Sequence, residues 1–222
     1  MRGRIRKIIQ PFLWKGYRWY LKKKRWYNHD GLKVCIYPSV FHPGLLWTTL
    51  YLLKFISHLE LKEKRVLELS AGSGLIALWT SRAGAIVSAS DINPAAIRSM
   101  KESAESNKLS LDIFHSDLFD AIPPQQFDYI FINPPFYPKK ASNDRERAFY
   151  CGPDFEYFRK LFLQIKKFIM PSTQIFLVLT DDCDLTTLSS LAQTENGILE
   201  LKAEQTKWKE QQLIYQLCYQ DF

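Results

Sequence analysis

The first 29 residues contain no aspartate or glutamate, although they carry ten of the 30 lysine and arginine side chains of this 222-residue chain. The other 193 residues hold 20 basic and 23 acidic side chains. The formal net charge of +7 and the pI near 9.1 therefore describe one segment, and the body of the protein is close to neutral. This distribution excludes a uniformly basic protein and marks the N-terminal segment as distinct.

Metal-binding and membrane-spanning patterns are also missing. None of the four cysteines forms a C-x-x-C pair or has a histidine at ligand spacing, which argues against a zinc site or a disulfide scaffold. We therefore expect no metal and a reduced, cytoplasmic compartment. The most apolar stretch, residues 45–61, is interrupted by Lys54, His58 and Glu60 and is shorter than the roughly 20 residues that a membrane-spanning helix needs. We expect no transmembrane span and no secretory signal.

The N-terminal segment is rich in rings as well as cations. Such a composition suits binding to a polyanion, either nucleic acid or an anionic membrane surface, because phosphates attract the cations and the rings stack on bases or enter the headgroup layer. The alternative is an apolar helical stripe, including Tyr17, Tyr20 and Leu21, that packs on the protein's own body. Both interpretations stay open, and we define residues 1–38 as a basic aromatic extension and residues 39–222 as one domain. The seven rings are Phe12, Trp14, Tyr17, Trp19, Tyr20, Trp26 and Tyr27.

The body alternates strand-like and helix-like blocks, which predicts an α/β fold with a mostly parallel sheet. The strand blocks are apolar or β-branched throughout, as strands covered on both faces should be. Two alternating runs at the end predict an antiparallel hairpin. The expected strands are residues 66–70, 85–91, 111–117, 127–135, 174–180, 198–207 and 211–220, and the expected helices are residues 45–61, 75–82, 94–106, 154–168 and 184–193.

A turn of small residues between the first of these strands and the following helix predicts a ligand site. Gly72 and Gly74 let the backbone approach a ligand, and the helix start offers unpaired N–H groups. Asp91 ends the next strand, where its carboxylate can accept both hydroxyls of a ribose. A nicotinamide dinucleotide fits this pattern loosely. Glu68 just before the turn favours S-adenosylmethionine instead, because a carboxylate suits its ammonium group better than a pyrophosphate.

The sequence Asn133-Pro134-Pro135-Phe136 follows a very apolar strand. Two prolines fix the chain direction and remove two donors, so the neighbouring carbonyls are free to accept hydrogen bonds. The Asn133 side chain adds another carbonyl, and Phe136 adds a flat face. Together they describe a slot for a planar –NH2 group at the carboxyl end of the sheet, where open α/β sheets bind ligands.

Residues 40–180 resemble the class I S-adenosylmethionine-dependent methyltransferases that carry an N-P-P-[YF] motif, a group with a HemK-like methyltransferase small domain. The resemblance implies a Rossmann-like, doubly wound sheet of seven strands, S-adenosyl-L-methionine as cofactor, and an enzyme that methylates nitrogen. It also implies catalytic roles for Asn133, Pro134, Pro135 and Phe136. The implied cofactor-binding residues are Thr49, Glu68, Ser70, Ala71, Gly72, Gly74, Asp91, Ile92, Asn93, Ser116, Asp117, Leu118 and Asn133. Ser70 departs from the family, which has glycine there.

Two stretches point to different substrates. Residues 146–162 resemble a stretch of the HemK-type protein-glutamine N5-methyltransferases, which places protein glutamine slightly ahead. Residues 40–44 with Thr48 and Thr49 resemble rRNA guanine methyltransferases, and a tRNA or rRNA base, at adenine N6 or guanine N2, better explains the basic arm. Partners would then be a protein or RNA substrate, with ribosome association as one form. A third hypothesis, from another class, is a non-catalytic cofactor-binding module tethered by its arm.

Overall fold

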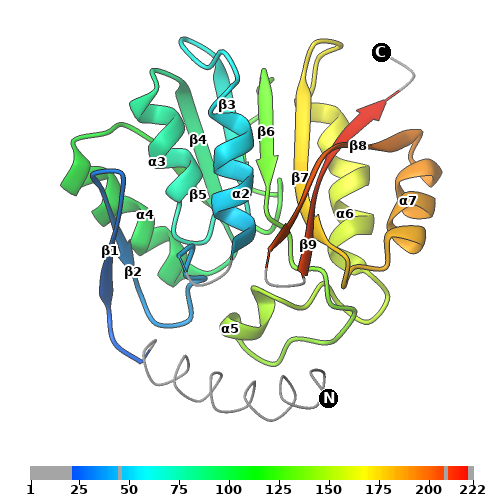
Figure 1. Ribbon diagram of the computed structural model, residues 1–222, viewed down its shortest axis with the longest axis horizontal. Helices are drawn as coiled ribbons and strands as arrows, with labels where there is room; N and C mark the ends of the chain where they lie inside the picture. Colours follow the sequence, from blue (N-terminus) through cyan, green and yellow to red (C-terminus); the bar gives the residue numbers. More distant parts are fainter. Residues whose placement is uncertain (1–21, 45–46, 208–209, 220–222) are drawn as a thin grey trace.

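A seven-stranded sheet forms the centre of the protein, and a computed structural model describes residues 22–44, 47–207 and 210–219 (Figure 1). Its strands are β3 (Arg65–Leu69), β4 (Ile86–Asp91), β5 (Asp112–His115), β6 (Tyr129–Ile132), β7 (Gln174–Thr180), β8 (Gly197–Lys207) and β9 (Glu210–Tyr219). They lie in the order β5-β4-β3-β6-β7-β9-β8. The pairs from β5 to β7 are parallel, and β9 is antiparallel to both β7 and β8. The predicted fold class, including the C-terminal hairpin, is confirmed.

Helices cover both faces of this sheet. They are α2 (Trp47–Ile56), α3 (Leu75–Arg82), α4 (Pro94–Asn107), α5 (Asp144–Arg147), α6 (Glu156–Ile165) and α7 (Leu185–Thr194), with a 3-10 turn η1 (Lys166–Phe168) after α6. Leu52, Ile76 and Met100, from α2, α3 and α4, lie in one buried cluster. Phe158 of α6 and Leu188 of α7 lie in a second. Successive strand residues supply the two clusters in turn, which explains why the strand sequences are apolar without alternation.

Several elements are shorter than the sequence predicts, and for one helix and one strand the structure shows the cause. The expected helix over residues 45–61 ends at Ile56, because Ser57 and the two residues after it continue in a tighter turn in which the Ser57 hydroxyl donates to the Lys54 carbonyl. The expected strand over residues 127–135 is confined to β6. Asn133 and the two prolines after it leave the sheet, since proline has no N–H to donate to a neighbouring strand.

A separate two-stranded hairpin, β1 (Arg25–His29) and β2 (Leu32–Ile36), packs on α4. Side chains of α4 accept hydrogen bonds from β2 backbone N–H groups: Ser103 Oγ from Cys35 at 2.8 Å and Asn107 Oδ1 from Lys33 at 2.9 Å. Ser99 Oγ accepts from the Tyr37 N–H at 3.1 Å just beyond the strand. The hairpin is therefore attached to the same helix that begins at the carboxyl end of β4.

Neighbouring side chains of β1, in the basic aromatic extension, point to opposite sides of the strand. Tyr27 packs edge-on to His42, with ring centroids 5.2 Å apart, while the Trp26 side chain is 50% exposed. Lys24 Nζ lies 5.5 Å from the centroid of the Trp26 ring. Tyr27 thus packs on the body while Trp26 faces outward, and the proposed helical stripe at Tyr17, Tyr20 and Leu21 lies outside the described residues. Within the described ranges, no helix is long and apolar enough to cross a membrane.

Candidate active site

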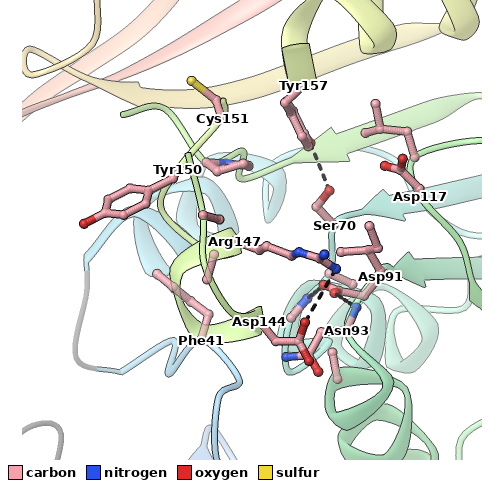
Figure 2. A pocket seen from close by; sticks show the side chains of 18 of the residues that line it. Phe41, Ser70, Asp91, Asn93, Asp117, Asp144, Arg147, Tyr150, Cys151 and Tyr157 are labelled. Carbon is pink, nitrogen blue, oxygen red and sulfur yellow. Dashed lines mark hydrogen bonds and ion pairs between the residues drawn. The ribbon is translucent and has the colours of Figure 1, made fainter. Parts of the chain in front are cut away.

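A pocket of about 580 Å³ opens at the carboxyl ends of the parallel strands (Figure 2). It brings together most of the site residues predicted from the sequence: Thr49, Glu68, Ser70, Ala71, Gly72, Asp91, Ile92, Asn93, Ser116, Asp117, Leu118, Asn133 and Pro135. Gly74, Pro134 and Phe136 are not among its lining residues. Further lining residues that sequence reasoning missed include Phe41, Asp144, Arg147, Tyr157 and Lys160.

The glycine loop after β3 contains three left-handed backbone conformations. Ser70 has φ +56°, Gly72 φ +56° and Gly74 φ +74°. Ser70 adopts a conformation that suits glycine, and its hydroxyl shares a 2.9 Å hydrogen bond with the Tyr157 hydroxyl (Figure 2). Burial raises the pKa of Tyr157, so its proton stays available for this bond. The serine that departs from the family pattern is therefore held by a partner on α6.

Glu68 is a buried carboxyl group of β3 that lies against the start of α3. Its Oε2 accepts a 2.7 Å hydrogen bond from the Ala77 N–H, one of the donors that a helix N-terminus leaves free. Gly74, the residue at the cap position, supplies no side-chain bond. Burial raises the pKa of Glu68 to about 8, although the helix N–H groups oppose this shift. Glu68 thus caps α3 while facing the pocket, and a cationic ligand group beside it would favour its ionised form.

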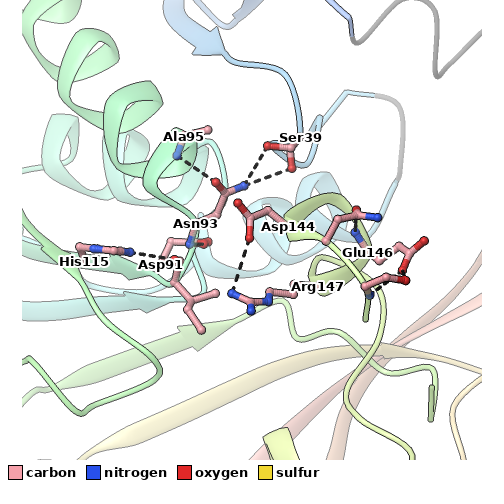
Figure 3. A network of polar contacts seen from close by, with 11 residues as sticks. Ser39, Asp91, Asn93, Ala95, His115, Asp144, Glu146 and Arg147 are labelled. Atoms are coloured by element: carbon pink, nitrogen blue, oxygen red, sulfur yellow. Dashed lines mark hydrogen bonds and ion pairs between the residues drawn. The ribbon is translucent and has the colours of Figure 1, made fainter. Parts of the chain in front are cut away.

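Asp91 and Asn93 fix the loop after β4 (Figure 3). The two Asp91 oxygens accept from the Gly72 and Asn93 N–H groups, each at 2.8 Å. Burial raises the pKa of Asp91 and these two bonds oppose the rise. The Asn93 side chain accepts from the Ala95 N–H at 2.9 Å and donates to the Ser39 carbonyl at 3.2 Å. Asp91 therefore joins the first two loops of the pocket and keeps lone pairs for a ligand hydroxyl.

Asp117, after β5, is bound by a lysine of α6. Lys160 Nζ contacts Asp117 Oδ2 and Asp120 Oδ2, each at 2.6 Å. Gln164 donates to the other Asp120 oxygen at 2.6 Å. Tyr157 and Lys160 lie three residues apart on α6 and so share a face. This face of α6 consequently holds both the glycine loop and the Asp117 loop.

The Asn133 side chain has a fixed orientation. Its Nδ2 donates a 3.0 Å hydrogen bond to Oγ1 of Thr49, a buried residue of α2, so its carbonyl oxygen is the part left for another ligand. Phe136 instead packs against the core cluster that contains Phe158, with its ring centroid 4.6 Å from that of Tyr137. The structure thus gives Thr49 a contact with Asn133, a pairing that no spacing in the sequence could have shown.

The loop between β6 and α6 closes the pocket from the outside. The Cys151 N–H donates to the Tyr137 carbonyl at 2.9 Å, and the Tyr137 N–H donates to the Phe149 carbonyl at 3.0 Å, which draws the two ends of the loop together. α5 lies inside this loop. The Phe149 ring meets Phe41 from the opposite rim, with centroids 6.1 Å apart. In the described part of the chain, no group of three or more acidic, histidine or cysteine side chains is placed to hold a metal ion.

A Rossmann-like sheet thus brings the glycine loop, the acidic end of β4 and residues Asn133 and Pro135 to one pocket, as in the expected methyltransferase class. The family model of the methyltransferase small domain matches residues 32–150. The chain belongs to this family, and the expected class, methyltransferases that use S-adenosylmethionine, is confirmed at the level of the family.

The similar proteins are named for two kinds of substrate, protein and ribosomal RNA. A provisionally named protein N5-glutamine methyltransferase of Methanocaldococcus jannaschii is 36% identical over 129 residues, which are 57% of this chain and 61% of the relative. A ribosomal RNA small subunit methyltransferase C of Alcanivorax borkumensis is 32% identical over 106 residues, 47% of this chain and 32% of the relative. The chain thus spans less than two thirds of either relative.

The fold is shared with a solved 16S rRNA guanine-N2 methyltransferase of T. thermophilus, in complex with S-adenosylmethionine and guanosine. That structure has a TM-score of 0.61 and 22% identity, and the match covers 87% of this chain and 50% of the other.

Proposed function

We propose that this protein transfers a methyl group from S-adenosylmethionine to a planar amide or amino nitrogen, and that a protein glutamine is the acceptor. The observation that carries this proposal is the Asn133 side chain, whose amide is fixed by Thr49 at a pocket that Glu68 and Asp91 also line. A fixed carbonyl acceptor at this place suits the N–H groups of an amide or an aminopurine.

The cofactor site follows from the same pocket. Glu68 would bind the ammonium group, Asp91 the ribose hydroxyls, and the loop from Ser116 to Leu118 the adenine. The family's cofactor supplies an electrophilic methyl group on a sulfonium. The loops of Ser70, Gly72 and Asp91 are linked by the bonds described above, so the cradle is largely formed before binding, which lowers the ordering cost.

Asn133 and its neighbours would orient the acceptor. An amide nitrogen is a weak nucleophile, because its lone pair is delocalised into the carbonyl. The Asn133 carbonyl and the Pro134 backbone carbonyl would accept its two N–H groups, so that positive charge developing on nitrogen is stabilised and the nitrogen is aligned with the methyl carbon. The nitrogen–carbon bond forms as the carbon–sulfur bond breaks, and the nitrogen loses one proton to water. The proposal includes a stacking role for Phe136. Its ring is half-buried, and the planar acceptor group would reach it from the side of the loop between β6 and α6.

Substitution of Asn133 tests the proposal directly. Asn133→Ala should lower kcat by roughly 100-fold or more while changing the affinity for S-adenosylhomocysteine by less than about threefold, since it removes a group aimed at the transition state. Thr49→Val should lower kcat by a smaller factor, because it frees the Asn133 side chain to rotate. Methyl transfer at an unchanged rate by Asn133→Ala would contradict the assignment. Cofactor binding without turnover by the unmodified protein would favour the non-catalytic module.

An RNA base is the second candidate acceptor, and the exposed Trp26 ring with Lys24 beside it favours it. Aromatic faces next to cations bind single-stranded bases, and the same segment could contact an anionic membrane. Labelled methyl donor incubated with protein and a total lysate separates these acceptors. Label that survives RNase but not protease identifies a protein acceptor, and the reverse identifies RNA. A reduced, cytoplasmic location remains part of this proposal, supported by four free cysteines.

A further inference from the structure

Positive charge inside the pocket is concentrated on three side chains, Lys140, Arg147 and Lys160. Lys160 is already bound to Asp117 and Asp120 at 2.6 Å, with its head group between two carboxylates. Lys140 is exposed at the outer end of the loop that follows Phe136. Arg147, at the end of α5, extends toward the labelled Ser70 and Asp91 side chains in Figure 2 and again toward Asp91 in Figure 3. Arg147 therefore extends into the pocket, and its guanidinium is not held between two carboxylates as the Lys160 ammonium is.

The ion pair that Arg147 makes in this position is weak. Its Nη1 lies 3.5 Å from Asp144 Oδ1, three residues earlier on the same short helix, and the two side chains are 50% and 45% exposed. Pairs of this kind contribute little, typically less than about 1 kcal/mol. The Arg147 guanidinium can therefore leave Asp144 for a ligand at a small cost in free energy. Until then, Asp144 keeps the guanidinium directed into the pocket.

The proposed cofactor needs such a group. Its amino acid end carries an ammonium and a carboxylate, and Glu68 can serve only the ammonium. A carboxylate placed among Glu68, Asp91 and Asp144 without a cation would lose its hydration and face like charges, which is unfavourable in a partly buried site. Arginine suits the task, because its planar fork donates two parallel hydrogen bonds to a carboxylate.

We propose that Arg147 binds the α-carboxylate of the cofactor. This inference rests on the proposed function. Arg147 belongs to the loop that begins at Asn133 and Phe136, whereas the other cofactor loops follow β3, β4 and β5. A bond from Arg147 to the cofactor would therefore join the acceptor-side loop to the cofactor site.

The test removes the carboxylate from the ligand and the guanidinium from the protein in turn. Binding of S-adenosylmethionine and of decarboxylated S-adenosylmethionine is measured by calorimetry for the unmodified protein, Arg147→Gln and Arg145→Gln. Arg145 is the matched control, because it lies on the same helix and does not line the pocket. Arg147→Gln should weaken S-adenosylmethionine by roughly 10- to 100-fold, as expected for a charge-assisted pair, and change the decarboxylated ligand by less than threefold. Arg145→Gln should change neither.

Three results would overturn the assignment. Equal weakening of both ligands by Arg147→Gln would mean that the side chain acts on something other than the carboxylate. An unchanged affinity for S-adenosylmethionine would mean that it does not contact the cofactor. If Lys140→Gln instead abolished the difference in affinity between the two ligands, Lys140 and not Arg147 would bind the carboxylate. If the unmodified protein binds neither ligand, the proposed function itself fails, which distinguishes the two hypotheses.

Discussion

Ser70 shows how one residue can depart from a motif without loss of the local structure. A left-handed conformation costs a non-glycine residue roughly 1–2 kcal/mol, and a hydrogen bond returns about 1 kcal/mol. Ser70→Gly should therefore leave the free energy of unfolding nearly unchanged, because it loses the Tyr157 bond and the strain together. Ser70→Ala keeps the strain and loses the bond, so it should be destabilised by about 1 kcal/mol. Urea denaturation of the two variants measures the difference, and equal stabilities would refute this account.

Tyr157→Phe provides the reciprocal variant. It removes the same hydrogen bond without altering the φ angle of Ser70, so it should match Ser70→Ala in stability to within a few tenths of a kcal/mol. Combined with Ser70→Ala it should cost little more than either change alone. Additive losses would show that Tyr157 stabilises the protein by another contact.

The raised pKa of Glu68 predicts a pH-dependent ligand affinity. The folded protein without ligand keeps this carboxyl protonated up to about pH 8, and an ammonium group beside it favours ionisation. Binding of S-adenosylhomocysteine at pH 7 should therefore release close to one proton, and affinity should rise between about pH 6 and pH 8. Calorimetry in two buffers of different ionisation enthalpy measures the release. Glu68→Gln, which can still accept from Ala77, should release none; the same release from both proteins would assign the proton elsewhere.

The same shift has a consequence for stability. The unfolded chain ionises Glu68 near its ordinary pKa of 4.5, whereas the folded chain holds the proton to about 8. Because the native state binds more protons in this window, the free energy of unfolding should fall as pH rises from about 4.5 to about 8. Chemical denaturation across this range should show the decline in the unmodified protein and a flatter profile in Glu68→Gln. A flat profile in both would contradict the burial of this carboxyl.

At the scale of elements, the start of α3 is packed directly against α4. A Cβ on Gly74 would come 2.6 Å from Met100 Cγ, while one on Gly72 would meet only Phe41 Cβ at 3.4 Å. Gly74→Ala should therefore cost about 1–3 kcal/mol for the clash, in addition to the backbone strain that Gly72→Ala shares. Gly72→Ala is the matched control. In the Met100→Ala background the excess cost of Gly74→Ala should disappear, and persistence of that excess in a thermal melt would exclude the clash as its cause.

The sequence predicts an element well where neighbouring residues along the chain determine it, and poorly where contacts between distant segments do. The strand that contains Glu68, the helix from Leu75 and the strand ending at Asp91 were predicted to within about a residue, since apolar periodicity and turn residues define them. The contacts of Tyr157 and Lys160 with the cofactor loops were not, because α6 lies far along the chain from Ser70 and Asp117. Hairpin β1–β2 was likewise missed, although Asp30 and Gly31, both with positive φ, form the two-residue turn that commonly joins hairpin strands. Its attachment to α4 through Ser103 and Asn107 is a tertiary contact that no local pattern shows.

For the molecule as a whole, the β1–β2 hairpin limits how much of the basic extension can be deleted without loss of stability. Removal of residues 1–29 would delete β1 and expose the paired edge of β2, so it should destabilise the protein. Removal of residues 1–21 keeps the hairpin and four of the ten cations, so it should preserve thermal stability and cofactor binding while lowering the affinity for the acceptor. That loss should shrink between about 50 mM and about 500 mM salt. Unchanged acceptor affinity at low salt would refute a binding role.

Helix α4 determines the distance between the pocket and the β1–β2 hairpin. It begins at the pocket, where Asn93 caps it. Further along the helix, Ser99 binds Tyr37 just beyond β2, and Ser103 and Asn107 bind β2 itself. Its 14 residues span about 21 Å. A chain held by Trp26 would therefore reach Asn133 across a rigid interval instead of a flexible linker. The distance between the docked segment and the pocket would then contribute to substrate selection. Only an acceptor nitrogen separated from that segment by the matching number of residues or nucleotides could enter the pocket.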